Sequence, residues 1–329
     1  MELREEVTAR GTRRPYYQVI DGVKRCPWIV PEYFRAGVNF RPSAGDILQS
    51  SHPKCGTHWV QYITQLILKE GKEPVKDHEE FTANSRAVDY WKHEDWKPKL
   101  PERLYYTHQP LCRQAMNPEA KYVYVARNPW DVCVSFYHMV SNVSIWRFQD
   151  GTFDEFVDAF IEGDFGYGSY FDHVAEAYAL RDEPNVFFMT YENLKKDTRG
   201  TVLRLARFLG DKYIGVLEEN EDLLQNILDW SKPDYMRNVM VVNFHIKQAE
   251  EWNELLGINS MSCKEGHEGN ENLYSIVRKA EVGGWKEHFT PDQLTRLEKK
   301  IRDEGDKAAF IELFKDIREE AAALSNISV

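Results

Sequence analysis

The sequence predicts an α/β fold built on a central parallel sheet. Four segments rich in Val, Ile, Leu, Phe and Tyr have the character of buried strands, and helical patterns directly follow three of them. Strands that alternate with helices are typical of parallel sheets. Of the 329 residues, 42% are hydrophobic and 13% are aromatic, which excludes disordered and low-complexity classes of protein.

The predicted elements follow one another in a regular order. No internal repeat and no Gly/Ser-rich linker divides the chain, so we expect one core with insertions. Ligands of parallel sheets bind at the carboxyl ends of the strands, which makes the residues after each strand the candidates for a site. The strands are expected at Asp46 to Ser51, Leu104 to Thr107, Tyr122 to Ala126 and Val186 to Thr190, and the helices at Thr57 to Lys69, Asp131 to Val140 and Asn193 to Leu209.

The charge balance argues against a nucleic-acid or membrane partner. The chain has 42 Lys and Arg against 53 Asp and Glu, a net charge of −11, whereas such partners attract basic surfaces. Its five cysteines form no C-x-x-C pair and have no zinc spacing, so we expect free thiols and no metal. The first fourteen residues lack the apolar region of a signal peptide, and no stretch resembles a membrane span. We therefore expect a cytoplasmic protein.

A candidate phosphate-binding loop follows the first predicted strand. Residues 51–59 read Ser-His-Pro-Lys-Cys-Gly-Thr-His-Trp and lead into an apolar helical pattern. Gly56 lets the backbone approach a ligand, the start of the helix favours an anion, and Lys54 adds a positive charge. The Walker pattern G-x-x-x-x-G-K-[ST] is absent, which argues against an ordinary ATPase or GTPase. A capped helix with a surface lysine also explains this segment taken alone.

Two further basic groups are candidates for binding an anion. Arg127 directly follows a predicted strand, and Ser135 lies eight residues later, about two helical turns on, where its hydroxyl could face the same crevice. Arg278 and Lys279 precede the flexible residues 282–285, Val-Gly-Gly-Trp. A structural salt bridge and a solvated surface patch explain these groups separately. Three basic groups in an acidic chain nevertheless favour an anionic ligand.

Two further motifs are Tyr-Thr-His-x-Pro around His108 and Tyr-Glu-Asn-Leu from Tyr191. Together with the segments above, they resemble the signatures of the cytosolic sulfotransferases, in the order that the family has them. The similarity extends from about Ile29 to Phe289. It implies one α/β sulfotransferase domain over residues 29–329, preceded by an N-terminal segment of residues 1–28. It also implies transfer of the sulfuryl group of 3′-phosphoadenosine-5′-phosphosulfate (PAPS) to a hydroxyl or amine of a small acceptor. The motifs are the phosphate loop, Arg-Asn…Asp…Val-Ser-x-Tyr-His from Arg127, Tyr-Thr-His-x-Pro around His108, Tyr-Glu-Asn-Leu from Tyr191 and Arg-Lys-x-x-x-Gly-x-Trp from Arg278.

The resemblance also implies roles for individual residues, in a reaction without a metal. His108 matches the catalytic histidine, and an imidazole can take the proton of the acceptor near neutral pH. Lys54 would neutralise the leaving phosphate. His52 and His138 are interpreted as structural or acceptor-lining. The donor and its product, 3′-phosphoadenosine-5′-phosphate, would be bound at the 5′ end by Lys54, Cys55, Gly56, Thr57 and His58, at the 3′-phosphate by Arg127, Ser135, Arg278, Lys279 and Ala280, and at the adenine by Trp59 and Tyr191.

Departures from the family pattern bear on function. Tyr106 stands where the family commonly has a lysine, so a cation is missing near the transferred group. Cys55 replaces the usual serine beside a lysine at a helix start. We expect a lowered pKa for this thiol, and hence that its oxidation blocks donor binding. Ala280 replaces a glycine, which carries a penalty if that position needs a positive φ. The dimer patch of the family, here residues 286–295, lacks its Val and Glu and gains a proline, so a monomer or a homodimer is expected.

The nature of the acceptor is less determined by the sequence. Apolar and mostly aromatic residues suit flat phenols or aryl amines, although a core stripe explains them equally well. Acidic neighbours could favour a cationic amine. Two other classes remain: a P-loop kinase, which should show a Walker motif and need magnesium, and a PAPS-binding protein that no longer catalyses or that uses sulfonation to drive an elimination. The apolar residues are Tyr90, Trp91, Met139 and Trp146, and the acidic ones are Asp89, Glu94 and Asp95.

Overall fold

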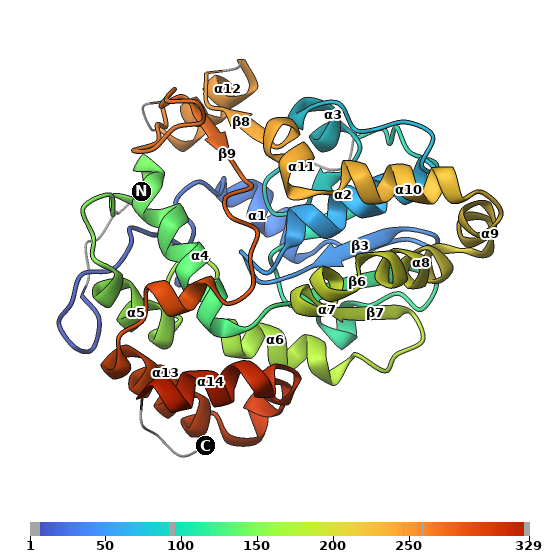
Figure 1. Ribbon diagram of the computed structural model, residues 1–329. Helices are drawn as coiled ribbons and strands as arrows, with labels where there is room; N and C mark the ends of the chain where they lie inside the picture. The colour runs from blue at the N-terminus through green and yellow to red at the C-terminus, as the bar shows by residue number, and fades with distance from the viewer. Residues whose placement is uncertain (1–6, 92–95, 246, 258–259, 326–329) are drawn as a thin grey trace.

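A five-stranded parallel sheet forms the centre of the molecule (Figure 1). The computed structural model describes residues 7–91, 96–245, 247–257 and 260–325. Every pairing in the sheet is parallel, which confirms the predicted α/β class with a central parallel sheet. The strands lie in the order β4 (Arg86–Ala87), β5 (Leu104–Thr107), β3 (Ile47–Ser50), β6 (Lys121–Ala126) and β7 (Val186–Thr190).

Helices cover both faces of this sheet, because its strands are apolar on both sides. Along β6, Tyr122 and Tyr124 face one buried cluster, whereas Val123 and Val125 face the other. The first half of the chain contributes α1 (Pro31–Val38), α2 (Thr57–Leu68), α3 (His78–Ala83), α4 (Pro129–Asn142), α5 (Phe153–Glu162), α6 (Tyr170–Ala179), α7 (Tyr191–Lys196) and α8 (Thr198–Leu209).

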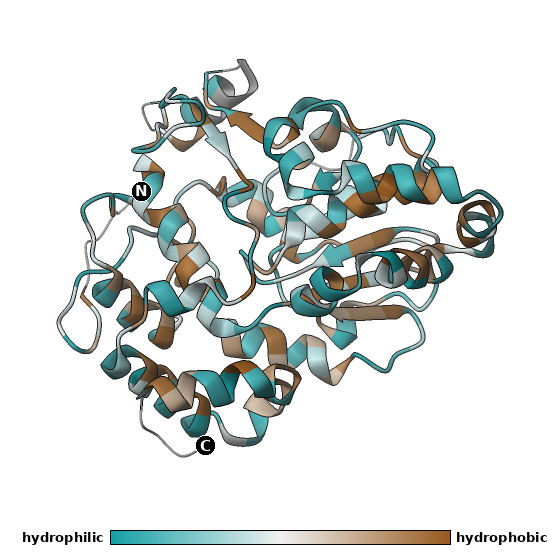
Figure 2. Ribbon diagram, viewed as in Figure 1, coloured by the Kyte–Doolittle hydropathy of each residue, from teal (hydrophilic) through white to brown (hydrophobic). Residues whose placement is uncertain are grey.

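The second half of the chain is mainly helical. Helices α2 and α10 lie on one side of the strands, and α6, α13 and α14 lie on the other (Figure 1). Figure 2 shows that α10, α13 and α14 each alternate between hydrophilic and hydrophobic residues, as expected of helices with one buried side. The helices are α9 (Asp211–Glu219), α10 (Glu221–Trp230), α11 (Pro233–Val239), α12 (Lys247–Leu256), α13 (Pro291–Asp303) and α14 (Lys315–Ser325).

Smaller elements complete the fold. Two antiparallel pairs join β1 (Gln18–Ile20) to β2 (Val23–Arg25) and β8 (Val241–Asn243) to β9 (Leu273–Ser275). Helix-like turns occur at η1 (Arg113–Ala115), η2 (Ser144–Trp146), η3 (Gly284–Glu287) and η4 (Gly305–Phe314). Within the described part of the chain, no helix is both long and apolar enough to cross a membrane.

One predicted helix is wrong. We expected a single helix from Asn193 to Leu209, but the chain forms α7 and α8 with a break at Asp197. The carboxylate of Asp197 accepts a hydrogen bond from the backbone N–H of Gly200 at 2.8 Å and so begins a new helix. The capping preference of this side chain therefore overrides the continuous apolar pattern.

Helix α4 begins two residues earlier than predicted. The side chain of Asn128 accepts a hydrogen bond from the N–H of Asp131 at 2.8 Å, and Pro129 takes the first helical position, where no donor is needed. The first turn of α4 therefore lies directly after the carboxyl end of β6.

The N-terminal residues pack against the body of the protein. The N–H of Tyr16 donates to the carbonyl of Trp146, and the N–H of Cys26 donates to the carbonyl of Gly166, both at 2.8 Å. The side chain of Arg14 pairs with Glu162 on α5 at 2.7 Å. A domain boundary at residue 28 stays a prediction.

Candidate functional site

The loop between β3 and α2 turns sharply at the carboxyl end of the sheet. Lys54 and Gly56 have φ angles of 71° and 105°. A Cβ on Gly56 would lie 2.8 Å from the ring of Tyr191, so only glycine fits at this position. The hydroxyls of Ser51 and Thr57 share a hydrogen bond of 2.6 Å that ties the two ends of the loop together. A strained non-glycine residue such as Lys54 is typical of functional sites.

The three basic groups expected from the sequence meet at this loop. A guanidinium N–H of Arg127 donates to the carbonyl of Lys54 at 3.4 Å, and another donates to the carbonyl of Glu281 at 2.7 Å. Burial, together with the charges of Arg278 and Arg127, lowers the pKa of Lys54 to about 8. Mutual repulsion of these cations makes an anionic ligand favourable here.

A buried carboxylate holds two of these groups together. Asp131, in the first turn of α4, is 3% exposed. Its carboxylate accepts hydrogen bonds from the backbone N–H groups of Gly283 at 2.9 Å and Trp285 at 3.2 Å. One oxygen also lies 3.6 Å from the guanidinium of Arg127. The sequence motif contained Asp131 but gave no sign of this link, because its partners lie about 150 residues away.

The remaining residues expected at the 3′-phosphate lie in the same cavity. Ser135 lines it two turns into α4, together with Arg278, Lys279 and Ala280. Ala280 has a φ of 55°, so the position where the family has glycine does adopt a conformation that favours glycine.

Two aromatic side chains lie beside the loop and the basic groups. The rings of Trp59 and Tyr191 lie 5.2 Å apart in an edge arrangement, and both line the cavity. The guanidinium of Arg127 lies over the Tyr191 ring at 4.4 Å. The indole N–H of Trp59 donates to the carbonyl of Ser231 at 2.9 Å, which fixes the ring. These two rings provide apolar faces beside the basic groups.

His108 follows β5 and lines the same cavity. Its Nδ1 lies 2.8 Å from the carbonyl oxygen of Ser51, and because a carbonyl can only accept, Nδ1 carries a proton. The lone pair of the neutral ring is therefore on Nε2. Burial, assisted by the charge of Lys54, lowers the pKa of His108 to about 4, so the ring is neutral at pH 7.

Asp89 supports the backbone at His108. Its carboxylate, 1% exposed, accepts hydrogen bonds from the N–H of His108 at 2.7 Å and from the hydroxyl of Thr107 at 2.7 and 2.9 Å. Burial raises the pKa of Asp89 to about 6. The carboxylate of Asp89 is therefore engaged by the backbone and side chain of this turn, and it does not face a cationic acceptor. Glu94 and Asp95, the other acidic neighbours, lie outside the described residues.

One cavity of about 1470 Å³ connects the basic groups with an aromatic region beyond His108. Of the four apolar residues expected there, Tyr90, Trp91 and Met139 line the cavity, whereas Trp146 is fully buried in the core. Trp28 and Tyr167 also line the cavity, and no sequence motif pointed to them. Their side chains share a 2.9 Å hydrogen bond, and the hydroxyl of Tyr167 also bonds that of Tyr90 at 2.7 Å.

Comparison with known proteins decides the family. The model of the sulfotransferase domain matches residues 44–317, most of the chain. The chain belongs to the sulfotransferase family. It is 28% identical to a 3-alpha-hydroxysteroid sulfotransferase of Cavia porcellus over 77% of this chain and 81% of that protein. It is 29% identical to an amine sulfotransferase of Oryctolagus cuniculus over 79% of this chain and 80% of that protein.

Solved structures show the same fold at low sequence identity. A mouse sulfotransferase complexed with PAP matches with a TM-score of 0.64 and 20% identity, over 92% of this chain and 99% of that one. Retinol dehydratase in a complex with retinol and PAP matches with a TM-score of 0.64 and 22% identity, over 93% of this chain and 97% of that one. The predicted sulfotransferase fold is therefore confirmed.

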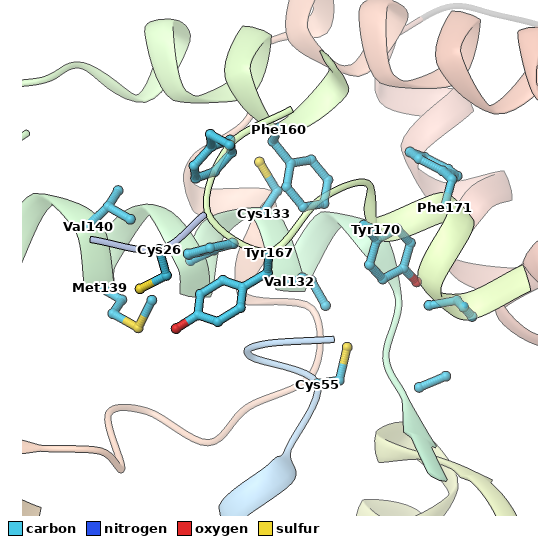
Figure 3. Close-up of a cluster of buried hydrophobic side chains, with 14 of the residues drawn as sticks. Cys26, Cys55, Val132, Cys133, Met139, Val140, Phe160, Tyr167, Tyr170 and Phe171 are labelled. Atoms are coloured by element: carbon cyan, nitrogen blue, oxygen red, sulfur yellow. The ribbon is translucent and has the colours of Figure 1, made fainter. Parts of the chain in front are cut away.

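Cys55 differs from our expectation for this sulfotransferase. The expected low pKa is wrong, because the side chain is 0% exposed and burial raises the pKa of the thiol well above its ordinary value. Cys55 belongs to the buried cluster of Figure 3. Its backbone N–H bonds the carbonyl of His52 at 3.3 Å. Cys55 therefore packs on the buried side of the loop. A buried thiol with a raised pKa gives no reason to expect that its oxidation controls donor binding.

Tyr106 and His58 are neighbours in this cavity. Their rings lie 6.5 Å apart, and both line the cavity. Burial raises the pKa of Tyr106 above its ordinary value and lowers that of His58 well below its own, so both are neutral at pH 7. Arg86, on the short strand β4, also lines the cavity, and its charge acts on Tyr106. The sequence gave no signal for Arg86, because its strand has only two residues.

The other predictions about this sulfotransferase have mixed outcomes. All five cysteines lie in the described part of the chain and are free. His52 is 1% exposed with its ring 5.7 Å from that of His173, in agreement with a structural role. Pro291 takes the first position of α13, where no hydrogen-bond donor is lost, so this proline is not an argument against a dimer.

Proposed function

We propose that this sulfotransferase transfers the sulfuryl group of PAPS to a hydroxyl or amine of a small phenolic or aryl-amine acceptor. Transfer occurs in line, with His108 as the general base. The observation that carries this proposal is that Lys54, Arg127 and Arg278 meet in the wall of the cavity that also contains His108. A donor with roughly four negative charges in two groups needs two sets of cations in one cavity.

The residues present fit such a donor. The Nε of Arg127 is buried and has no hydrogen-bond partner among the described residues, as expected of a group that awaits an anion. Gly56 leaves space beside Tyr191 that a side chain would fill. Arg127, Ser135, Arg278 and Lys279 would hold the 3′-phosphate, with Ala280 beside them. Lys54, Gly56, Thr57 and His58 would hold the 5′ end, and Trp59 and Tyr191 would hold the adenine. Two structural relatives were solved in complexes with PAP, which is 3′-phosphoadenosine-5′-phosphate, and this supports the assignment.

When bound, the donor supplies an activated sulfuryl group with a phosphate as its leaving group. The Nε2 of neutral His108 accepts the proton of the acceptor as the acceptor oxygen or nitrogen attacks. Lys54 stabilises the charge that develops on the leaving phosphate. The hydrogen bond from Nδ1 of His108 to Ser51 orients the ring, and Asp89 holds the backbone at His108. Tyr106 contributes a neutral phenol where relatives commonly place a cation.

The cavity supports a flat, apolar acceptor. The aromatic side chains in its wall include Trp28, Tyr90, Trp91, Trp96, Tyr106 and Tyr167. Aromatic walls suit ring compounds, and the hydroxyl pair of Tyr90 and Tyr167 gives one polar point inside them. Because relatives are named as hydroxysteroid and amine sulfotransferases, both a steroid alcohol and an amine belong beside phenols in the test panel.

The proposal is tested with radiolabelled PAPS, in the presence of EDTA, and a panel of 4-nitrophenol, dopamine and a hydroxysteroid. Labelled product is expected from the phenol or the amine. His108→Ala should abolish turnover and leave nucleotide affinity nearly unchanged, whereas Arg127→Ala should weaken nucleotide binding. His245→Ala, at an exposed histidine, is the matched control and should retain turnover. Full turnover by His108→Ala would refute the base role, and nucleotide binding without product from any acceptor would refute the transfer.

A further inference from the structure

A histidine near the basic groups has no role in the proposed reaction. His138 lies one turn after Ser135 on α4, and residues three apart on a helix share a face. Both residues line the cavity. The Nε2 of His138 is buried and has no hydrogen-bond partner among the described residues. A buried polar atom of this kind at a cavity wall indicates that a ligand supplies its partner.

Positive groups surround this imidazole. The cations Arg278 and Lys279 act on it from the C-terminal segment, and Lys54 acts from the loop. His288 also lies beside it, but burial and the same two cations lower the pKa of His288, so that its ring is neutral at pH 7. The ring of His288 lies 5.1 Å away, edge to face. The neighbouring carboxylate of Glu287 is bound to the ammonium group of Lys279 at 2.7 Å. Burial, together with these cations, lowers the pKa of His138 to about 4, so it is neutral at pH 7 without a ligand.

We propose that His138 is a further ligand of the 3′-phosphate and that it takes up a proton when the nucleotide binds. The inference rests on the proposed function, because it takes the donor to be a nucleotide with phosphate at both ends. A phosphate dianion at Ser135, Arg278 and Lys279 reverses the sign of the field at His138. The proton comes from solvent, occupies the remaining lone pair of the ring, and completes a charge-assisted hydrogen bond to a phosphate oxygen.

This coupling gives nucleotide affinity a definite dependence on pH. Since binding takes up a proton, the affinity contributed by His138 increases as the pH falls toward 6 and decreases as the pH rises. The second ionisation of the phosphate itself, near pH 6, acts in the opposite direction. A comparison between the wild-type protein and a His138 variant cancels that contribution, because the phosphate is the same in both.

The test is isothermal titration of the full chain at pH 6.5 in two buffers of different ionisation enthalpy. The ligands are 3′-phosphoadenosine-5′-phosphate and adenosine 5′-phosphate, which lacks the 3′-phosphate. The wild-type protein should take up protons with the first ligand, by about half to one proton more than His138→Asn, and the variant should bind that ligand about tenfold more weakly. Both proteins should bind the second ligand equally. His288→Asn is the matched control and should retain the proton uptake.

Each outcome bears on the inference. Equal proton uptake in the wild-type protein and His138→Asn overturns it, as does loss of uptake in His288→Asn instead. His138→Gln and thermal melting of each variant control for a folding defect. The difference in proton uptake between the two ligands is measured on the wild-type protein, so it does not depend on any variant. Failure of the wild-type protein to bind 3′-phosphoadenosine-5′-phosphate overturns the proposed function as well. Tight binding without His138-dependent uptake overturns this inference alone.

Discussion

Replacing Ala280 by glycine should stabilise the protein by about 1 kcal/mol. Ala280 has a φ of 55°, a conformation in which a side chain is unfavourable by roughly 1–2 kcal/mol. Glycine removes that strain, but it makes the unfolded chain more flexible, which destabilises the folded state by about 0.4–1 kcal/mol. The difference leaves a net gain. The position also lies in the cavity wall between Lys279 and Glu281, so the change tests backbone strain at the proposed nucleotide site.

Urea denaturation followed by circular dichroism is the appropriate assay. For a chain of 329 residues, an entropy of about 2.1 cal/mol/K per residue makes 1 kcal/mol equal to only about 1.5 °C in melting temperature, whereas a denaturant midpoint resolves it better. The matched control is Ala323→Gly, which removes the same methyl group from an exposed position in α14 and should destabilise by about 1 kcal/mol. If Ala280→Gly destabilises the protein as much as Ala323→Gly does, the reasoning from the positive φ is refuted.

Three further predictions concern reactivity, stability and pH. A bulky thiol reagent should label Cys112 first in the folded protein, because it is exposed and the other four cysteines are buried; equal labelling of Cys55 in peptide mass maps would contradict this. Asp131→Asn should lower the free energy of unfolding by roughly 2 kcal/mol and weaken nucleotide binding, since an amide replaces one of the two oxygens that accept backbone N–H groups. Unchanged urea and titration curves would show that the contact of Asp131 with Gly283 and Trp285 does not support the site. On the acid side, kcat/KM should fall only below about pH 5, because His108 is the proposed base and its pKa is about 4; an acid limb near pH 6.5 would argue against that assignment.

The strands could be predicted because burial on both faces leaves a strong local signal. The apolar runs at β3, β5, β6 and β7 appear at or within a residue of their predicted positions. Strand β4 has two residues and therefore has no pattern to detect. The break between α7 and α8 depends on one capping carboxylate, that of Asp197, against an apolar pattern that continues through it. Local capping is visible in the sequence, but its competition with packing is not.

The basic groups of the site could be predicted because each directly follows a strand or lies in a recognisable motif. The direction in which a side chain faces could not be predicted from the sequence. Cys55 lies between Lys54 and Gly56, yet it faces the core while both neighbours line the cavity. Asp89 was one of three acidic neighbours that could favour a cationic amine, but its carboxylate accepts a hydrogen bond from the backbone N–H of His108. These outcomes depend on the tertiary path of the loops, which the sequence pattern does not encode locally.

The carboxylate of Asp131 joins parts of the chain that are synthesised far apart. Because its partners Gly283 and Trp285 come late in the sequence, a nascent chain has only half of the pocket until the last fifth has been translated and has docked. The proposed bisphosphate nucleotide can then bind only the finished protein. At one hundred times its dissociation constant it would add about 2.7 kcal/mol to the folded state by mass action. Cellular nucleotide supply would thereby influence how much of this protein survives proteolysis.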